Sequence, residues 1–326
     1  MSDFLSDIRR PIEAELEEFT RFFNSSLDHT DGTLSQALDF IRRREGKRMR
    51  PILTLLIAKC FGRVNESTHR AAVGLELLHT ASLVHDDVVD EAKERRGQAS
   101  VNAIYDNRVS VLVGDYILST AVNSMSLTRN LDIVMRLSLL GQTLASGEIL
   151  QMTSNGSDNI SEQDYYEVIR KKTASLFEAC AAMGAMSVNA AEEDVRAAGQ
   201  FGQTIGMIFQ IRDDIFDYFE DSDIGKPTGN DMLEGKLTLP AIHVVLNTSD
   251  EDIKAIAMKV KDRCATAQEI ARLVEYTKVN GGIEYAGLQM DRLYDEALVF
   301  VENNVRDKDL KDALTAYLNY VIQRKL

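Results

Sequence analysis

The sequence predicts an all-α protein, a single-domain helical bundle that spans residues 1–326. Three observations predict this fold class. Apolar residues recur with a helical period in nearly every segment, and strand-like alternation is nowhere sustained. The chain contains only 4 prolines, so long helices can run without interruption. Length alone would permit two domains. Because there is no low-complexity linker and no repeat of fixed period, one helical domain is the simplest account.

The helical pattern begins clearly at Ala71. From Ala71 to Val89 the apolar side chains include Val73, Leu77 and Val84, and the segment from Val109 to Met125 is more apolar still. Short polar turns separate these segments from the later ones. The predicted helices cover residues 71–89, 109–125, 132–152, 162–186, 192–219, 240–246, 268–279 and 283–305.

Composition excludes several classes of protein. The formal net charge of −14 argues against a nucleic-acid binder, which needs a basic face for phosphate contacts. The 3 cysteines lie far apart without the spacing of a zinc site or a disulfide framework, which favours a reducing cytoplasm. The N-terminal segment lacks the apolar core of a signal peptide. No apolar run approaches the ~20 residues of a membrane span, so we expect no transmembrane segment.

Two aspartate motifs stand out, one at 86–90 and one at 213–217. Each reads Asp-Asp-x-x-Asp and lies near the end of an apolar helix. Residues four apart share a face of a helix, so Asp86 points with Asp90, and Asp213 points with Asp217. The middle aspartate of each motif lies about 100° around the helix from them. Like charges at that spacing destabilise a helix mildly unless a counterion is present. Each cluster therefore calls for a cation.

Magnesium suits these clusters better than calcium. Mg²⁺ takes oxygen ligands and is usually bound through one or two carboxylates together with substrate phosphates. Neither motif has the spacing or the glycine of an EF-hand loop. A single Asp-Asp-x-x-Asp could be merely a charged helix end, but two copies separated by more than a hundred residues are hard to explain in that way.

Basic clusters alternate with the aspartate motifs along the chain. Arg and Lys side chains bind phosphate oxygens, so an acidic protein that binds polyanions should concentrate them at its site. A single basic cluster would be interpreted simply as a solvent-exposed part of the surface. Their alternation with the motifs favours diphosphate chemistry. The clusters lie at residues 46–51, 95–97, 171–173, 225–227 and 231–236.

At these residues the chain resembles the trans-prenyltransferases, the polyprenyl diphosphate synthase family. The pieces GKRMRP, LLHTASLVHDDVVDEAKERRG, GEILQ, KKTASLF, FQIRDDIFDY and DMLEGKLTLP match family motifs in order. The resemblance runs through essentially the whole chain from Gly46 and implies the isoprenoid synthase type of helical bundle, with a central substrate tunnel. One departure is Ala99, where the family often has proline.

The resemblance also implies roles for single residues. Up to three Mg²⁺ ions would bridge an allylic diphosphate, and Lys172, Thr173 and Gln210 would face the developing cation at the reacting carbon. His79 reads equally well as a buried helix histidine if the resemblance is set aside. The metal ligands would be Asp86, Asp87, Asp90, Asp213, Asp214 and Asp217; the allylic diphosphate site Arg95, Gln151, Lys172, Lys226 and Lys236; and the isopentenyl diphosphate site Lys47, Arg50, His79 and Arg96.

The helix before the first motif should line the tunnel. Ala81 and Ser82 lie ~6–8 Å before the metal site, at 1.5 Å rise per residue. In the family, aromatic residues there stop growth at about fifteen carbons, so these small side chains favour a C30–C50 product for a quinone side chain. They could also simply permit close helix packing, and a geranylgeranyl or farnesyl product is the alternative. Further candidates for a chain-length role are Leu78, Ile117 and Leu118.

Three rival functions remain at this point. A terpene cyclase would usually alter the second motif, and a non-catalytic synthase subunit would lose aspartates; here all six are present. A structural helical bundle that binds Mg²⁺ or Ca²⁺ would not need the basic clusters. The resemblance further implies a homodimer, to which the apolar helix 109–125 could contribute, although a buried core helix explains that segment equally well. For release of a lipid product, peripheral contact with a membrane is also compatible with the sequence.

Overall fold

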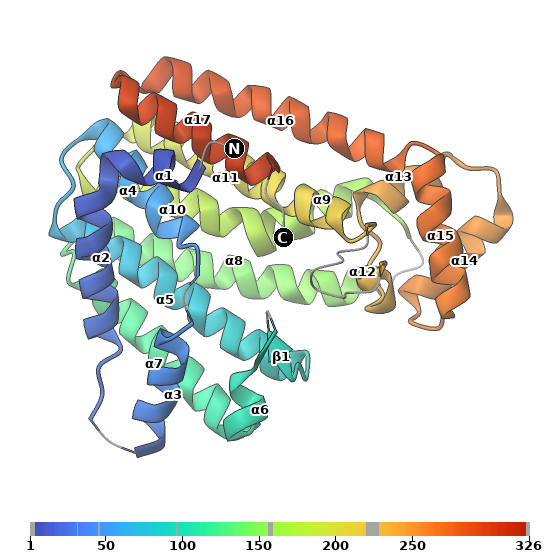
Figure 1. The fold of residues 1–326 in the computed structure, drawn as a ribbon, viewed down its shortest axis with the longest axis horizontal. Helices are drawn as coiled ribbons and strands as arrows, with labels where there is room; N and C mark the ends of the chain where they lie inside the picture. Colours follow the sequence, from blue (N-terminus) through green and yellow to red (C-terminus); the bar gives the residue numbers. More distant parts are fainter. Residues whose placement is uncertain are drawn as a thin grey trace. The chain divides into compact units, whose positions relative to one another are not determined.

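The computed structural model describes residues 4–30, 32–44, 46–95, 97–155, 159–219 and 228–323. In this part of the chain almost every element is a helix, and the one sheet is a hairpin of two short antiparallel strands (Figure 1). The predicted all-α class is therefore confirmed. No helix among these residues combines the length and apolarity needed to cross a membrane.

The helices and strands follow one another along the chain in a fixed order. They are α1 (Phe4–Arg9), η1 (Arg10–Ile12), α2 (Glu13–Ser26), α3 (Gly32–Arg42), α4 (Met49–Phe61), α5 (Glu66–Val89), β1 (Glu94–Arg95), β2 (Gln98–Ala99), α6 (Val101–Tyr105), α7 (Asn107–Ser126), α8 (Leu131–Asn155), α9 (Glu162–Ile169), η2 (Arg170–Ala174), α10 (Ser175–Ser187), α11 (Glu192–Phe216), α12 (Asn230–Leu233), α13 (Leu239–Asn247), α14 (Glu251–Lys261), α15 (Ala267–Val279), α16 (Gly282–Asn304) and α17 (Lys308–Gln323).

Each of the eight predicted helical segments is helical in the structure. The segment 162–186 is more complex than predicted, because the π-helical turn η2 separates α9 from α10. The fifth segment ends at Phe216, three residues earlier than predicted. The sequence reading did not assign α3, α14 or α17, although Asp250 caps α14 by accepting the backbone N–H groups of Asp252 and Ile253.

The chain forms two compact units, which we describe one at a time. Unit 1 comprises Met1–Gly141, Leu176–Gly202 and Val301–Ala316; unit 2 comprises Gln142–Ser175, Gln203–Phe300 and Tyr317–Leu326. The boundaries fall within helices α8, α10, α11, α16 and α17. That the chain is one domain remains a prediction.

Helix α5 is the central element of unit 1 and carries the first aspartate motif in its last turn. It begins with a capping box, in which Asn65 accepts the Thr68 N–H and the Thr68 hydroxyl accepts the Asn65 N–H, both at 3.3 Å. Two glycines allow α7 to approach it closely. A methyl group at Gly74 would lie 2.7 Å from Cε of Met125, and one at Gly114 would lie 2.2 Å from Nε2 of His85. The motif therefore sits on a helix that is fixed at both ends.

The second aspartate motif lies in unit 2, where α11 ends. Directly after the motif, Tyr218 is buried in an apolar cluster with side chains of α13, α14 and α15. Its hydroxyl lies 3.2 Å from that of Thr238, just before α13. Gly229 precedes α12 with a φ of +78°, a left-handed conformation that glycine adopts without strain. These contacts tie the chain on both sides of α12 to the end of α11.

Candidate active site

The first motif presents its three aspartates differently. Asp87 is only 2 % exposed, and its carboxylate accepts a hydrogen bond from Nε of Arg95 at 2.6 Å. Asp86 is half-buried and Asp90 is exposed. The amide of Asn102, on α6, donates to the Asp87 backbone carbonyl at 3.1 Å. The middle aspartate thus binds the hairpin that carries Arg95, while the outer two lie nearer to solvent.

The basic residues assigned to isopentenyl diphosphate also belong to unit 1. Arg50 lies in the first turn of α4 with its guanidinium carbon 5.0 Å from the centroid of the Phe177 ring. Its Nε is buried and has no hydrogen-bond partner among the residues that the structure describes. Lys47 is exposed in the loop before α4, and His79 is half-buried on α5. Arg96 lies outside the described residues.

The second motif repeats this arrangement of aspartates in unit 2. Asp214, the middle one, is 4 % exposed, whereas Asp213 and Asp217 are half-buried. One oxygen of Asp214 accepts the Tyr165 hydroxyl at 2.6 Å, and the other accepts the side-chain amide of Gln210 at 2.8 Å. The Asp217 carboxylate accepts the backbone N–H groups of Asn230 at 3.0 Å and of Asp231 at 3.1 Å. Asp217 therefore also caps the start of α12.

Six of the predicted residues of unit 2 line one pocket. Thr173 lies beside Lys172 in the π-helical turn η2, and its hydroxyl donates to Oε1 of Gln210 at 2.7 Å. Turns of this kind are frequent at functional sites. Residues from η2, α8, α11, α12 and the segment before α13 line the pocket. They include Gln151, Lys172, Thr173, Gln210, Asp214, Asp231 and Lys236.

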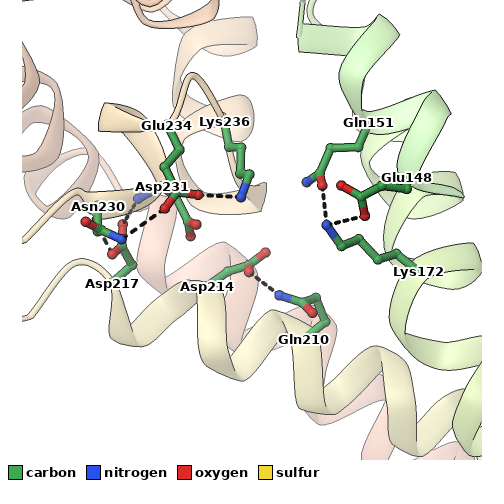
Figure 2. Close-up of polar contacts among 10 residues, drawn as sticks. All are labelled: Glu148, Gln151, Lys172, Gln210, Asp214, Asp217, Asn230, Asp231, Glu234 and Lys236. Carbon is green, nitrogen blue, oxygen red and sulfur yellow. Dashed lines mark hydrogen bonds and ion pairs between the residues drawn. The ribbon is translucent and has the colours of Figure 1, made fainter. Parts of the chain in front are cut away.

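Two lysines of this pocket pair with carboxylates (Figure 2). The amino group of Lys172 lies 2.6 Å from Oε2 of Glu148 and 2.6 Å from Oε1 of Gln151. The amino group of Lys236 lies 2.5 Å from Oε2 of Glu234. A diphosphate that used either lysine would compete with a protein carboxylate. Lys226 lies outside the described residues.

Two acidic residues of this pocket, Asp214 and Asp231, have raised pKa values. Burial, and then the neighbouring Asp231, raises the pKa of Asp214. Burial, and then Asp217, raises the pKa of Asp231. In both residues burial disfavours the ionised form, and a divalent cation held nearby by hard oxygen ligands would favour it. The donor set therefore fits Mg²⁺.

The aspartates do not form a closed metal cage by themselves. Among the described residues, no group of three or more His, Cys, Asp or Glu side chains is arranged to hold a metal ion. Mg²⁺ is usually bound through one or two carboxylates, with waters and substrate phosphates as its other ligands. The separated aspartates fit that kind of substrate-completed site.

Sequence reasoning missed three residues that the geometry places in this network. Glu148 and Asp231 stand inside the quoted pieces GEILQ and DMLEGKLTLP, so their position gave a signal that was not used. Tyr165 gave none, because a tyrosine on an amphipathic helix is read as part of the core. Its hydroxyl partner lies 49 residues away in the sequence.

The residues predicted to control chain length lie on α5 and α7 of unit 1. Ala81, Leu78 and Ile117 are buried, and Ser82 and Leu118 are half-buried. The Ser82 hydroxyl donates to the His79 carbonyl at 2.9 Å, one turn back on the same helix. The polar atom of Ser82 is thus used within its own helix.

Known proteins resemble this chain over most of its length. Residues 31–277 match the family model described as Polyprenyl synthetase. The chain is 35 % identical over 300 residues to heptaprenyl diphosphate synthase component 2 of Geobacillus stearothermophilus, covering 91 % of this chain and 90 % of the relative. It is 32 % identical over 280 residues to octaprenyl diphosphate synthase of Escherichia coli, covering 86 % of each.

Two solved structures are similar over nearly the whole chain. A geranylgeranyl pyrophosphate synthase from Bacteroides thetaiotaomicron has a TM-score of 0.87 at 49 % identity, with 99 % of this chain and 100 % of that one covered. A polyprenyl synthase from Caulobacter crescentus, complexed with calcium and isoprenyl diphosphate, has a TM-score of 0.90 at 27 % identity, with 99 % and 98 % covered. The chain belongs to the polyprenyl synthetase family and is a prenyltransferase, a trans-polyprenyl diphosphate synthase.

Proposed function

We propose that this prenyltransferase is Mg²⁺-dependent and adds isopentenyl diphosphate to an allylic diphosphate, farnesyl or geranylgeranyl, in successive trans 1′-4 condensations. The observation that carries the proposal is the pocket of unit 2, where Lys172, Thr173 and Gln210 meet the buried carboxylates of Asp214 and Asp231. A cation for phosphate, dipoles for a carbocation and aspartates that can hold metal ions nearby are what this reaction requires.

Each group has one task in the proposed reaction. The allylic diphosphate is bound by Lys172, Lys236, Arg95 and Lys226. Lys47, Arg50, His79 and Arg96 bind isopentenyl diphosphate. Asp86, Asp90, Asp213 and Asp217 hold the divalent ions. When bound, these ions neutralise the charge that develops on the leaving diphosphate.

The carbon chemistry then depends on groups that hold charge without reacting. The departing diphosphate leaves an allylic cation, and the oxygens of Thr173 and Gln210 face it as negative ends of dipoles. The double bond of isopentenyl diphosphate attacks the cation, and a proton leaves the adduct. Glu148 is ion-paired with Lys172, so we assign the proton to the departed diphosphate rather than to a side chain. Water must be excluded because it would capture the cation.

An assay with farnesyl diphosphate, labelled isopentenyl diphosphate and Mg²⁺ tests the proposal. We expect diphosphate release, a labelled product that remains a diphosphate, and loss of both on chelation of the metal. A hydrocarbon formed without isopentenyl diphosphate would instead indicate a cyclase. Absence of turnover in the purified chain, restored by a second protein, would indicate a synthase subunit.

For the product we propose a length of C30 to C50. Support comes from the small, buried Ala81 and from the contact of Gly74 with Met125. Gly74 lies ~18 Å before Asp86 along the helix, at 1.5 Å rise per residue, so a floor there would be deeper than one at Ala81. A C20 product is the second candidate, favoured by the 49 % identity to the structure named geranylgeranyl pyrophosphate synthase. Chromatography of the assay product distinguishes the two.

Ala81→Phe should shorten the product to about fifteen carbons. The side chain is 1 % exposed, and a phenyl ring would fill the space that a growing chain needs. Overpacking costs about 1–3 kcal/mol, so folding is checked by thermal melting. Leu83→Phe places the same ring about 200° around the helix and should leave product length unchanged. Unchanged product from a folded Ala81→Phe variant would contradict the chain-length role.

We also propose that the chain is a homodimer through α7 and α8 of unit 1. Leu131, Met135 and Leu139 form an exposed apolar stripe on α8, with 71 %, 54 % and 58 % of each residue exposed. On α7 one face is buried, as a core helix requires, while Leu112 and Val122 on the other face are exposed. Sedimentation equilibrium should give twice the chain mass, and Met135→Glu should shift it toward the monomer. A monomeric wild-type protein would exclude this interface.

A further inference from the structure

A chain of hydrogen bonds extends behind the reacting residues of unit 2 and ends at a tyrosine. The Thr173 hydroxyl donates to Oε1 of Gln210, and Nε2 of Gln210 donates to Oδ1 of Asp214. The Tyr165 hydroxyl then donates to Oδ2 of Asp214. The three distances are 2.7, 2.8 and 2.6 Å, so every link is well formed. Figure 2 shows Gln210 and Asp214 turned toward each other.

The hydrogen bonds to Asp214 and Thr173 determine the orientation of the Gln210 side-chain amide. A glutamine amide can rotate by 180° and exchange its oxygen with its nitrogen. Here Asp214 accepts from the nitrogen, so the oxygen of Gln210 must face Thr173. The opposite orientation would place the NH₂ group of Gln210 where the proposed function requires a negative dipole. Asp214 therefore determines which end of Gln210 is presented to the reacting centre.

Tyr165 in turn holds Asp214. The carboxylate and the tyrosine ring are both buried, and the two donors to Asp214 are uncharged. No Lys or Arg among the described residues pairs with this carboxylate. Loss of one of two neutral donors leaves a buried oxygen unsatisfied and free to seek another partner. The position of Asp214 thus depends directly on the tyrosine hydroxyl.

From this geometry we infer that Tyr165 is a positioning residue for the condensation, acting through Asp214 to hold Gln210 with its oxygen toward Thr173. The inference rests on the proposed roles of Thr173 and Gln210. It separates Asp214 from the outer aspartates of its motif: Asp214 orients Gln210, while Asp213 and Asp217 serve the metal ions.

Tyr165→Phe tests the inference because it removes only the hydroxyl. We expect kcat to fall about tenfold, with both KM values and the Mg²⁺ concentration for half-maximal rate within about twofold of wild type. Tyr166→Phe is the matched control: the neighbouring ring packs edge-on against Tyr165 at 5.4 Å but takes no part in the hydrogen-bond chain. Wild-type kcat in Tyr165→Phe, or an increased Mg²⁺ requirement, would overturn the inference.

A double-mutant cycle tests whether Tyr165 acts through Asp214. In Asp214→Asn the side-chain amide has one oxygen and one NH₂ group. It can therefore accept a hydrogen bond from Gln210 or from Tyr165, but not from both. Asp214→Asn should reduce kcat more than Tyr165→Phe does. In the Asp214→Asn background, Tyr165→Phe should cost less than twofold further. Fully additive losses would show that the tyrosine acts elsewhere.

One readout is independent of turnover. The side-chain amide resonance of Gln210 in ¹⁵N-glutamine-labelled protein, assigned with Gln210→Glu, should shift in Tyr165→Phe and stay in place in Tyr166→Phe. An unchanged resonance in a folded Tyr165→Phe protein would overturn the inference. Because this signal needs no substrate, it decides the positioning role even if the proposed reaction itself is not observed.

Discussion

Asp213→Asn should lower kcat/KM about a thousandfold while leaving the fold intact. Asp213 is half-buried at the end of α11, and its charge is one of those that raise the pKa of Asp214. Removing it takes away a proposed metal ligand, and loss of a charge-stabilising group in an active site costs on the order of 10²–10³ in rate, more where a metal ion is lost with it. The check is steady-state kinetics across a Mg²⁺ titration.

Unlike kcat/KM, the stability of the metal-free protein should not fall in Asp213→Asn. Like charges in one cluster are destabilising without a counterion, so the metal-free variant should melt at or above the wild-type temperature. Added Mg²⁺ and an unreactive allylic diphosphate analogue should stabilise the wild type and have little effect on Asp213→Asn. Asp291 and Asp295, exposed on α16 with the same four-residue spacing, provide the control. Their asparagine variants should retain full activity. A Mg²⁺ response unchanged by Asp213→Asn would contradict the assignment.

Sequence periodicity predicted the long helices well because their buried faces are long. Helices α5, α7, α8 and α11 each extend over twenty or more residues, so a 3.6-residue pattern repeats many times. Helices α14 and α17, of 11 and 16 residues, were not among the predicted segments, although the 9-residue α13 was. The break at η2 was not predicted, because it shifts the hydrophobic pattern by one residue only, and the segments on either side are too short to reveal that shift.

The sequence alone predicted which charged residues form the candidate site, but not how they pair with one another. Spacing alone predicted that Asp86 and Asp90 share a face and that Asp87 lies around the helix from them. The structure agrees, with Asp87 buried against Arg95. What spacing could not provide is pairing across the fold. The contacts of Glu148 with Lys172 and of Tyr165 with Asp214 join residues 24 and 49 positions apart, and only tertiary structure brings them together.

Pairing changes the interpretation of the basic residues. The sequence presented Lys171 and Lys172 as one cluster, whereas the structure sends them to different partners. Lys171 lies 3.1 Å from Glu167, and Lys172 lies 2.6 Å from Glu148. Of the two, only Lys172 lines the pocket. Adjacent, equally charged and similarly paired, they form a natural comparison.

Lys172→Met should lower kcat/KM for the allylic diphosphate by about 10²- to 10³-fold, the usual cost of removing one group that stabilises developing charge. Lys171→Met should change it by less than about threefold, because Lys171 pairs with Glu167 and does not line the pocket. Steady-state kinetics with varied allylic diphosphate measures both. Equal losses in the two variants would show that the cluster acts only through its summed charge.

Replacing the carboxylate that pairs with Lys172 should have the opposite effect on the affinity for the allylic diphosphate. Glu148 holds the amino group of Lys172, so a diphosphate that used this lysine would compete with Glu148. Glu148→Gln removes that competing charge and should lower KM for the allylic diphosphate several-fold, whereas Glu167→Gln should leave it unchanged. If KM rises instead, Glu148 is needed to orient Lys172 toward the diphosphate, and the ion pair persists when the substrate is bound. The direction of that single change therefore decides whether the acidic partner of Lys172 competes with the substrate or prepares for it.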